Sequence, residues 1–117
     1  MNDKHATAHF LDDLYEIIAS RKGGNPEISY TAKLFEEGLG KMAGKIGEEA
    51  TEVIVAALRE TPDHLISESA DLLYHLLVLW AEQGIIPEDV FEELQSRAGR
   101  SGVEEKESRD QETVDVL

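Results

Sequence analysis

The chain has 117 residues and no cysteine, and its 25 acidic and 11 basic residues give a net charge of −14. The length suffices for one domain with a single core, the lack of cysteine excludes disulfides and thiolate metal sites, and the acidity argues against binding of DNA or RNA. Because the first ten residues lack the apolar core of a signal peptide and no apolar run approaches the roughly 18 residues of a membrane span, we expect a cytoplasmic protein without membrane contacts.

Helical periodicity dominates the first half of the chain. Apolar residues between Phe10 and Ile18 recur at helical spacing and predict a helix over about residues 8–22. The sequence GGNPE then interrupts the pattern with glycine and proline. Residues 28–38 are expected to form a loop that contains one short helical turn, and a long helix is predicted over about residues 39–60.

Two further helices are predicted in the second half. The pair Thr61-Pro62 is typical of an N-cap followed by the first residue of a helix, and this third helix should end before Gly84. Pro87 begins a fourth helix, which stops at the next glycine. We therefore expect one all-α domain over residues 1–109, followed by a flexible acidic tail over residues 110–117.

The third predicted helix is apolar on nearly every side. Leucine, valine and tryptophan residues between Leu72 and Trp80 cover most directions around its axis. Such a helix must be buried on most sides, and one small bundle cannot easily cover it. The pattern predicts a homodimer in which helices of two subunits share a core.

Two pairs of acidic residues lie at three-residue spacing on consecutive helices. Glu49 and Glu52 lie on one side of the helix over 39–60, and Glu68 and Asp71 share one stripe of the next helix. Glu48 points about 100° away from Glu49. Because the turn between the two helices is short, the helices should pack antiparallel, so that the pairs can face each other.

Facing carboxylates favour a metal site. They repel one another unless a cation or raised pKa values neutralise them, and oxygen ligands prefer Mg²⁺, with Mn²⁺ as a substitute, over zinc. The motif E-E-x-x-E alone is weak evidence, because exposed helices commonly carry solvated acids. Its combination with E-x-x-D on an apolar helix is stronger evidence. His75, one turn beyond Asp71, is more typical of a hydrogen-bonded structural residue than of a ligand.

Four stretches of the sequence resemble a known family. GEEATEVIVAA and ESADLLYHLLVL resemble the paired helices of the all-α MazG-like nucleotide pyrophosphohydrolases. SYTAKL and RAGRSGVEEKESR narrow the resemblance to the phosphoribosyl-ATP pyrophosphohydrolases of histidine biosynthesis, over roughly residues 10–109. The resemblance implies a four-helix MazG-like bundle with helices shared across a homodimer. It also implies Mg²⁺-dependent hydrolysis of phosphoribosyl-ATP to phosphoribosyl-AMP and pyrophosphate.

The resemblance also implies roles for individual residues. The metal ligands would be Glu49, Glu52, Glu68 and Asp71. Glu48 would orient or deprotonate the attacking water. The substrate carries a triphosphate and a ribose phosphate, so basic and hydroxyl groups must offset its charge. The candidates are Ser29, Tyr30, Thr31, Lys33, Lys41, Lys45, Arg97, Lys106 and Arg109. Surface charge would equally explain Lys41, packing would explain Tyr30, and capping of a helix end would explain Arg97.

The residues leave two other functions open. A house-cleaning pyrophosphohydrolase for ordinary or damaged nucleotides would share the fold and the acids, but would release pyrophosphate from deoxynucleoside triphosphates. A non-enzymatic helical interaction module would carry the acids as solvated surface, and Mg²⁺ would leave its melting temperature unchanged. A separate cyclohydrolase, the expected next enzyme, is a candidate partner.

Overall fold

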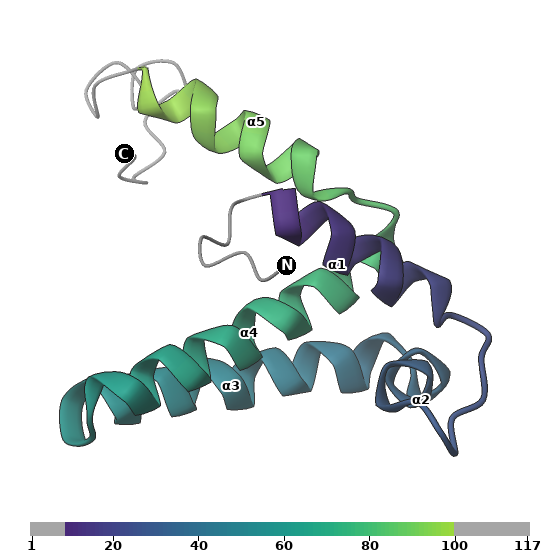
Figure 1. Cartoon of the computed structure of the whole chain (residues 1–117), viewed down its shortest axis with the longest axis horizontal. Coiled ribbons are helices and arrows are strands. Elements are labelled where there is room, and N and C mark those ends of the chain that lie inside the picture. The colour runs from purple at the N-terminus through teal and green to yellow at the C-terminus, as the bar shows by residue number, and fades with distance from the viewer. Residues whose placement is uncertain (1–8, 100–117) are drawn as a thin grey trace, which may run out of the picture.

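The computed structural model describes residues 9–99, and the regular secondary structure within that range is helical (Figure 1). The helices are α1 (His9–Ser20), α2 (Tyr30–Glu37), α3 (Leu39–Arg59), α4 (Pro62–Gln83) and α5 (Pro87–Ala98). This confirms the prediction of an all-α protein. No helix of the described range is long and apolar enough to cross a membrane. The tail over residues 110–117 lies outside the described residues, and the domain limits stay predictions.

Local sequence signals set the ends of α4. The Thr61 hydroxyl accepts a hydrogen bond from the backbone N–H of His64 at 3.3 Å, and Pro62, which has no N–H to satisfy, is the first helical residue. At the other end Gly84 adopts φ 75°, a left-handed conformation that costs glycine little. The predicted boundaries of this helix are therefore confirmed.

The prediction of four helices was wrong at residues 28–38, where α2 forms a helix of eight residues. The Ser29 hydroxyl caps it by accepting a hydrogen bond from the N–H of Ala32 at 3.0 Å. Ala32, Leu34 and Phe35 are buried, so tertiary packing stabilises a helix too short to show a repeated apolar stripe. Gly38, at φ 99°, then turns the chain directly into α3.

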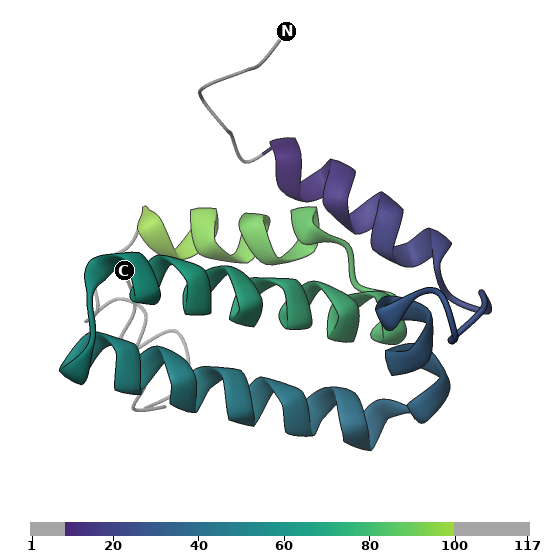
Figure 2. The same cartoon turned by 60° about the horizontal axis from the view of Figure 1, so that its bottom comes forward.

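An antiparallel pair of long helices, α3 and α4, forms the most extensive contact in the described structure (Figures 1 and 2). Their short connection at residues 60–61 enforces this geometry. The core lies toward the end where α3 begins and α4 ends, and α1 and α2 pack there. Its buried residues are Tyr15, Ile18, Leu34, Phe35, Met42, Leu77 and Val78.

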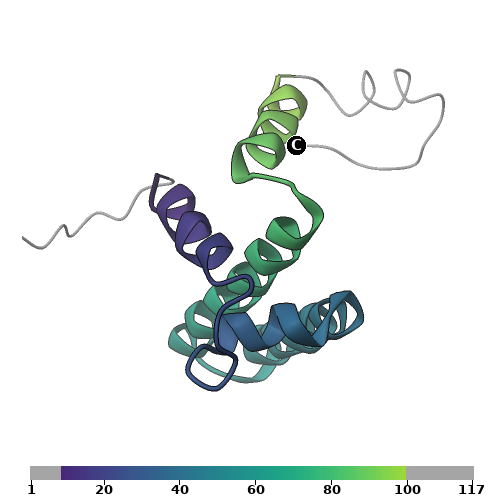
Figure 3. The same ribbon diagram turned by 90° about the vertical axis from the view of Figure 1, so that its right-hand side faces the viewer.

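The fifth helix stands apart from the α3–α4 pair. It packs against α1, and Figure 3 shows it on the side of α1 and α4 that lies away from α3. The helices therefore leave much of α3 uncovered within this one chain. Closure into a four-helix bundle and the sharing of helices between two subunits stay predictions.

Candidate functional site

Three carboxylates converge midway along the α3–α4 pair. Glu49 of α3 and Glu68 and Asp71 of α4 each offer an oxygen, and these oxygens lie within 4.8 Å of one another. Glu49 and Glu68 are half-buried, whereas Asp71 is exposed. The antiparallel pairing brings them to the same depth, so the structure brings together three of the four predicted ligands.

The fourth predicted ligand, Glu52, lies beside this trio rather than in it. Its side chain is exposed on α3. Partial burial and then the charges of Glu52, Asp71 and Glu49 raise the pKa of Glu68 above its ordinary value. The negative charge of Glu52 therefore adds to that of the trio. Glu49, Glu52, Glu68 and Asp71 together are called the acidic unit below.

The trio fits a hard divalent cation. All three ligand atoms are carboxylate oxygens, which suit Mg²⁺ and Mn²⁺. Two oxygens on opposite sides of one Mg²⁺ are separated by about 4 Å, since each metal–oxygen bond is about 2.0–2.1 Å long. A spacing of up to 4.8 Å would be closed by small rotations of the side chains, or by a water between ligand and ion.

A lysine stands one turn before Glu49. The Lys45 Nζ donates to Glu48 Oε1 at 3.3 Å, and this hydrogen bond, with smaller effects of nearby negative charges that include Glu49, raises the pKa of Lys45. Glu48 is exposed and belongs to this ion pair rather than to the trio. The structure thus places a cation against the acidic unit at the end facing α2.

An aromatic and histidine cluster lies one turn beyond Asp71. His75 is buried, and its Nδ1 lies 2.8 Å from the backbone carbonyl oxygen of Asp71. Because a carbonyl can only accept, Nδ1 carries the proton and Nε2 is left to accept from the Tyr30 hydroxyl at 3.4 Å. The interpretation of His75 as a structural residue therefore agrees with its hydrogen bonds. The Tyr30 ring also stacks on Tyr74.

Sequence reasoning missed Tyr74. Its hydroxyl bonds the hydroxyl of Thr31, while burial raises the pKa of Tyr74 and this hydrogen bond lowers it. The available signal was its spacing, since Tyr74 follows Asp71 by three residues and therefore shares its side of α4. The hydrogen bond between Thr31 and Tyr74 therefore joins α2 to α4 next to the acidic residues of α4.

The remaining predicted phosphate-binding residues are scattered. Lys33 and Lys41 are exposed and form no ion pair within residues 9–99. Arg97 pairs with Glu93 at 2.9 Å near the end of α5, away from the trio. Lys106 and Arg109 lie outside the described residues.

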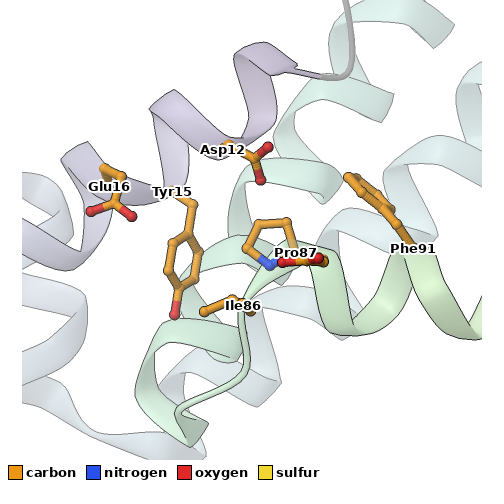
Figure 4. Close-up of a pocket in the computed structure, with 7 residues that line it drawn as sticks. Asp12, Tyr15, Glu16, Ile86, Pro87 and Phe91 are labelled. Atoms are coloured by element: carbon orange, nitrogen blue, oxygen red, sulfur yellow. The ribbon is translucent and has the colours of Figure 1, made fainter.

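A separate hollow of about 500 Å³ lies between α1 and the start of α5 (Figure 4). Asp12, Glu16 and Glu88 line it together with the aromatic rings of Tyr15 and Phe91, and no basic residue does. Such a lining repels phosphates. This hollow is therefore not a candidate for binding a nucleotide.

Comparisons with known proteins agree with this geometry. A family model described as phosphoribosyl-ATP pyrophosphohydrolase matches residues 11–98, which include α2 and every member of the acidic unit. The chain belongs to the phosphoribosyl-ATP pyrophosphohydrolase family. The resemblance inferred from the sequence motifs is thereby confirmed.

Individual members of the phosphoribosyl-ATP pyrophosphohydrolase family match over most of their length. A phosphoribosyl-ATP pyrophosphatase of Paramagnetospirillum magneticum is 61% identical over 99 residues, which is 85% of this chain and 91% of the relative. One from Azospirillum brasilense is 50% identical over 109 residues, 93% of this chain and 98% of the relative. One from Rhodospirillum rubrum is 56% identical over 99 residues, 85% of each chain.

Proposed function

We propose that this chain hydrolyses phosphoribosyl-ATP to phosphoribosyl-AMP and pyrophosphate, the second step of histidine biosynthesis, in the cytoplasm, with Mg²⁺ bound by its acidic unit. The observation that carries the proposal is the convergence of Glu49, Glu68 and Asp71 within a chain of this family. Glu52 is the fourth ligand, directly or through water. When bound, Mg²⁺ would neutralise phosphate charge and assist attack by water.

The chain's own residues position the reacting groups. Lys45, held by Glu48, faces the charge that develops on the pyrophosphate leaving group. Glu48, released from Lys45 when the lysine turns to phosphate, is the candidate for orienting the attacking water. Lys33 and Lys41 add positive charge on the approach from α2. Ser29, Tyr30 and Thr31 keep α2 at the edge of the site.

We also propose that the active protein is a homodimer. Three large apolar side chains near the free end of the α3–α4 pair are strongly exposed in the single chain: Ile54 at 57%, Leu58 at 77% and Ile66 at 67%. They belong to the neighbouring helices α3 and α4, and we propose that a second copy covers this apolar surface. A contact of Arg97, Lys106 or Arg109 with a neighbouring subunit's substrate, and docking of a cyclohydrolase, stay predictions.

The decisive experiment is a pyrophosphate-release assay. The purified chain should release pyrophosphate from phosphoribosyl-ATP in Mg²⁺ and lose this activity in EDTA. Deoxynucleoside triphosphates should be poor substrates, and efficient cleavage of them would favour a house-cleaning enzyme instead. Absence of activity on every nucleotide, with no Mg²⁺ effect on the melting temperature, would favour an interaction module.

A further inference from the structure

A second hollow lies at the turn between α1 and α2. Figure 2 shows this turn at the end of the molecule where α3 begins. It has a volume of about 440 Å³. Its lining residues are Ser20, Arg21, Gly24, Asn25, Ile28 and Ser29. None of these is acidic, although the chain carries 25 acidic residues, and one is an arginine. The hollow therefore differs in charge from the acid-lined one between α1 and α5.

The hollow presents hydrogen-bond donors without partners. The Arg21 guanidinium forms no hydrogen bond or ion pair with any residue of the range 9–99. Asn25 uses its Oδ1 to accept from the N–H of Glu27 at 2.9 Å, which leaves its amide N–H groups available. Ser29 uses its oxygen to accept from Ala32, which leaves its O–H available. A cation beside two neutral donors suits a phosphate monoester.

The hollow is joined to the acidic unit through the start of α2. Ser29 lines the hollow, and the next residue, Tyr30, places its hydroxyl 3.4 Å from His75 Nε2. His75 in turn lies one helical turn, about 6 Å of axial rise, beyond Asp71. Tyr30 and His75 thus form a chain of contacts from the edge of the hollow to the trio.

We propose that this hollow binds the phosphate monoester at the phosphoribosyl end of the substrate, with Arg21 as its principal contact, while the triphosphate lies at the acidic unit. This inference rests on the proposed function and adds a determinant of its specificity. The phosphoribosyl end distinguishes the substrate from ATP and from deoxynucleoside triphosphates. Ile28, which is 83% exposed at the rim, offers an apolar contact to the sugar.

The first test measures binding without catalysis. Ribose 5-phosphate is titrated into the full-length chain and followed by amide chemical shifts. Shifts should centre on residues 20–29, and Arg21→Ala should weaken binding by about tenfold or more, the size expected for loss of a charge-assisted hydrogen bond. Arg59→Ala is the matched control, because it removes an exposed cation that also has no ion pair within residues 9–99. Arg21→Lys should restore part of the affinity.

Titrations with other anions distinguish a specific sugar-phosphate site from a general anion-binding site. Pyrophosphate with Mg²⁺ should shift amides around Glu49 and Asp71, and its affinity should not change in Arg21→Ala. Inorganic phosphate should bind more weakly than ribose 5-phosphate. Equal affinity of ribose 5-phosphate for wild type and Arg21→Ala, or equal affinity of inorganic phosphate and ribose 5-phosphate for wild type, would overturn the proposal.

The second test is kinetic. Arg21→Ala should raise KM for phosphoribosyl-ATP by about tenfold with little change in kcat, because the contact is made equally in ground and transition states. Cleavage of deoxynucleoside triphosphates, however slow, should not change. An unchanged KM for phosphoribosyl-ATP in Arg21→Ala would overturn the assignment to this substrate. If wild type bound ribose 5-phosphate through Arg21 but released no pyrophosphate from phosphoribosyl-ATP, the proposed function would fail and the hollow would stand as a sugar-phosphate site.

Discussion

The hydroxyl of Thr31 on α2 is hydrogen-bonded to the phenol hydroxyl of Tyr74 on α4. This bond joins α2, whose buried residues are Ala32, Leu34 and Phe35, to the helix that carries Glu68 and Asp71. Thr31 is therefore occupied within the protein fold. We therefore expect any contribution of Thr31 to substrate binding to be indirect, through the position of α2.

Replacing Thr31 with valine tests this role. Valine matches threonine in shape but leaves the half-buried Tyr74 hydroxyl without its partner, so the free energy of unfolding should fall by about 1 kcal/mol. The pKa of Tyr74 should rise further, because the Thr31 hydrogen bond lowers it. Urea unfolding and ultraviolet titration of tyrosine measure the two effects. Thr51→Val removes an exposed hydroxyl on α3 and should change stability by less than about 0.5 kcal/mol.

The sequence predicts the acidic unit well because helical geometry is regular. Residues three apart must share a side of a helix, and a short turn must make two helices antiparallel. These two constraints place Glu49, Glu68 and Asp71 on facing sides of the two helices. The depth of packing, on which the convergence depends, comes from the core around Met42 and Val78.

Other features could not be derived from the sequence. Only eight residues long, α2 is specified by its contacts with α3 and α4 more than by its own periodicity. The contacts of long, flexible side chains are equally hard to predict. The Lys45 side chain can reach several carboxylates, and in the structure it pairs with Glu48. The hollow containing Arg21 depends on the course of an irregular turn. The spacing of apolar residues does not predict the backbone course of such a segment.

The apolar surface of the α3–α4 pair predicts the effect of a charge at its centre. Leu58→Glu should dissociate the homodimer at micromolar concentration, because a carboxylate cannot be buried there without a partner. Leu58 is 77% exposed in the single chain, so the subunit's own fold should survive. Sedimentation velocity and circular dichroism measure the two properties. Gln83→Glu adds the same charge at the far end of α4 and should leave the dimer intact. A wild-type protein that sediments as a folded monomer would contradict the proposal.

Lys45 should contribute to the rate of reaction more than to substrate binding. If it meets charge that develops on the leaving pyrophosphate, Lys45→Ala should lower kcat strongly, whereas Lys33→Ala should mainly raise KM. Steady-state kinetics on phosphoribosyl-ATP separate the two effects. Wild-type kinetics in both variants, with unchanged circular dichroism, would exclude a phosphate-binding role for either lysine.

The raised pKa of Glu68 predicts how stability depends on pH without metal. Its folded-state pKa lies above its ordinary value of 4.5, so the folded state binds more protons between the two values than the unfolded state does. The melting temperature in EDTA should therefore fall as pH rises from about 4.5 through the folded-state pKa. Glu68→Gln should flatten this slope. Glu92→Gln, an exposed acid of α5, is the control and should keep it.

Removing one carboxylate from the trio should have opposite effects with and without Mg²⁺. In EDTA the like charges of Glu49, Glu68 and Asp71 repel, so Glu49→Gln and Asp71→Asn should each raise the melting temperature. Mg²⁺ stabilises only the state that binds it, so both variants should lose most of the metal-induced rise and all activity. Glu48→Gln should lose activity but keep much of that rise, because Glu48 lies outside the trio, and Glu92→Gln should keep both. Thermal unfolding with and without Mg²⁺ provides the comparison. A full Mg²⁺ response in both Glu49→Gln and Asp71→Asn would place the metal elsewhere.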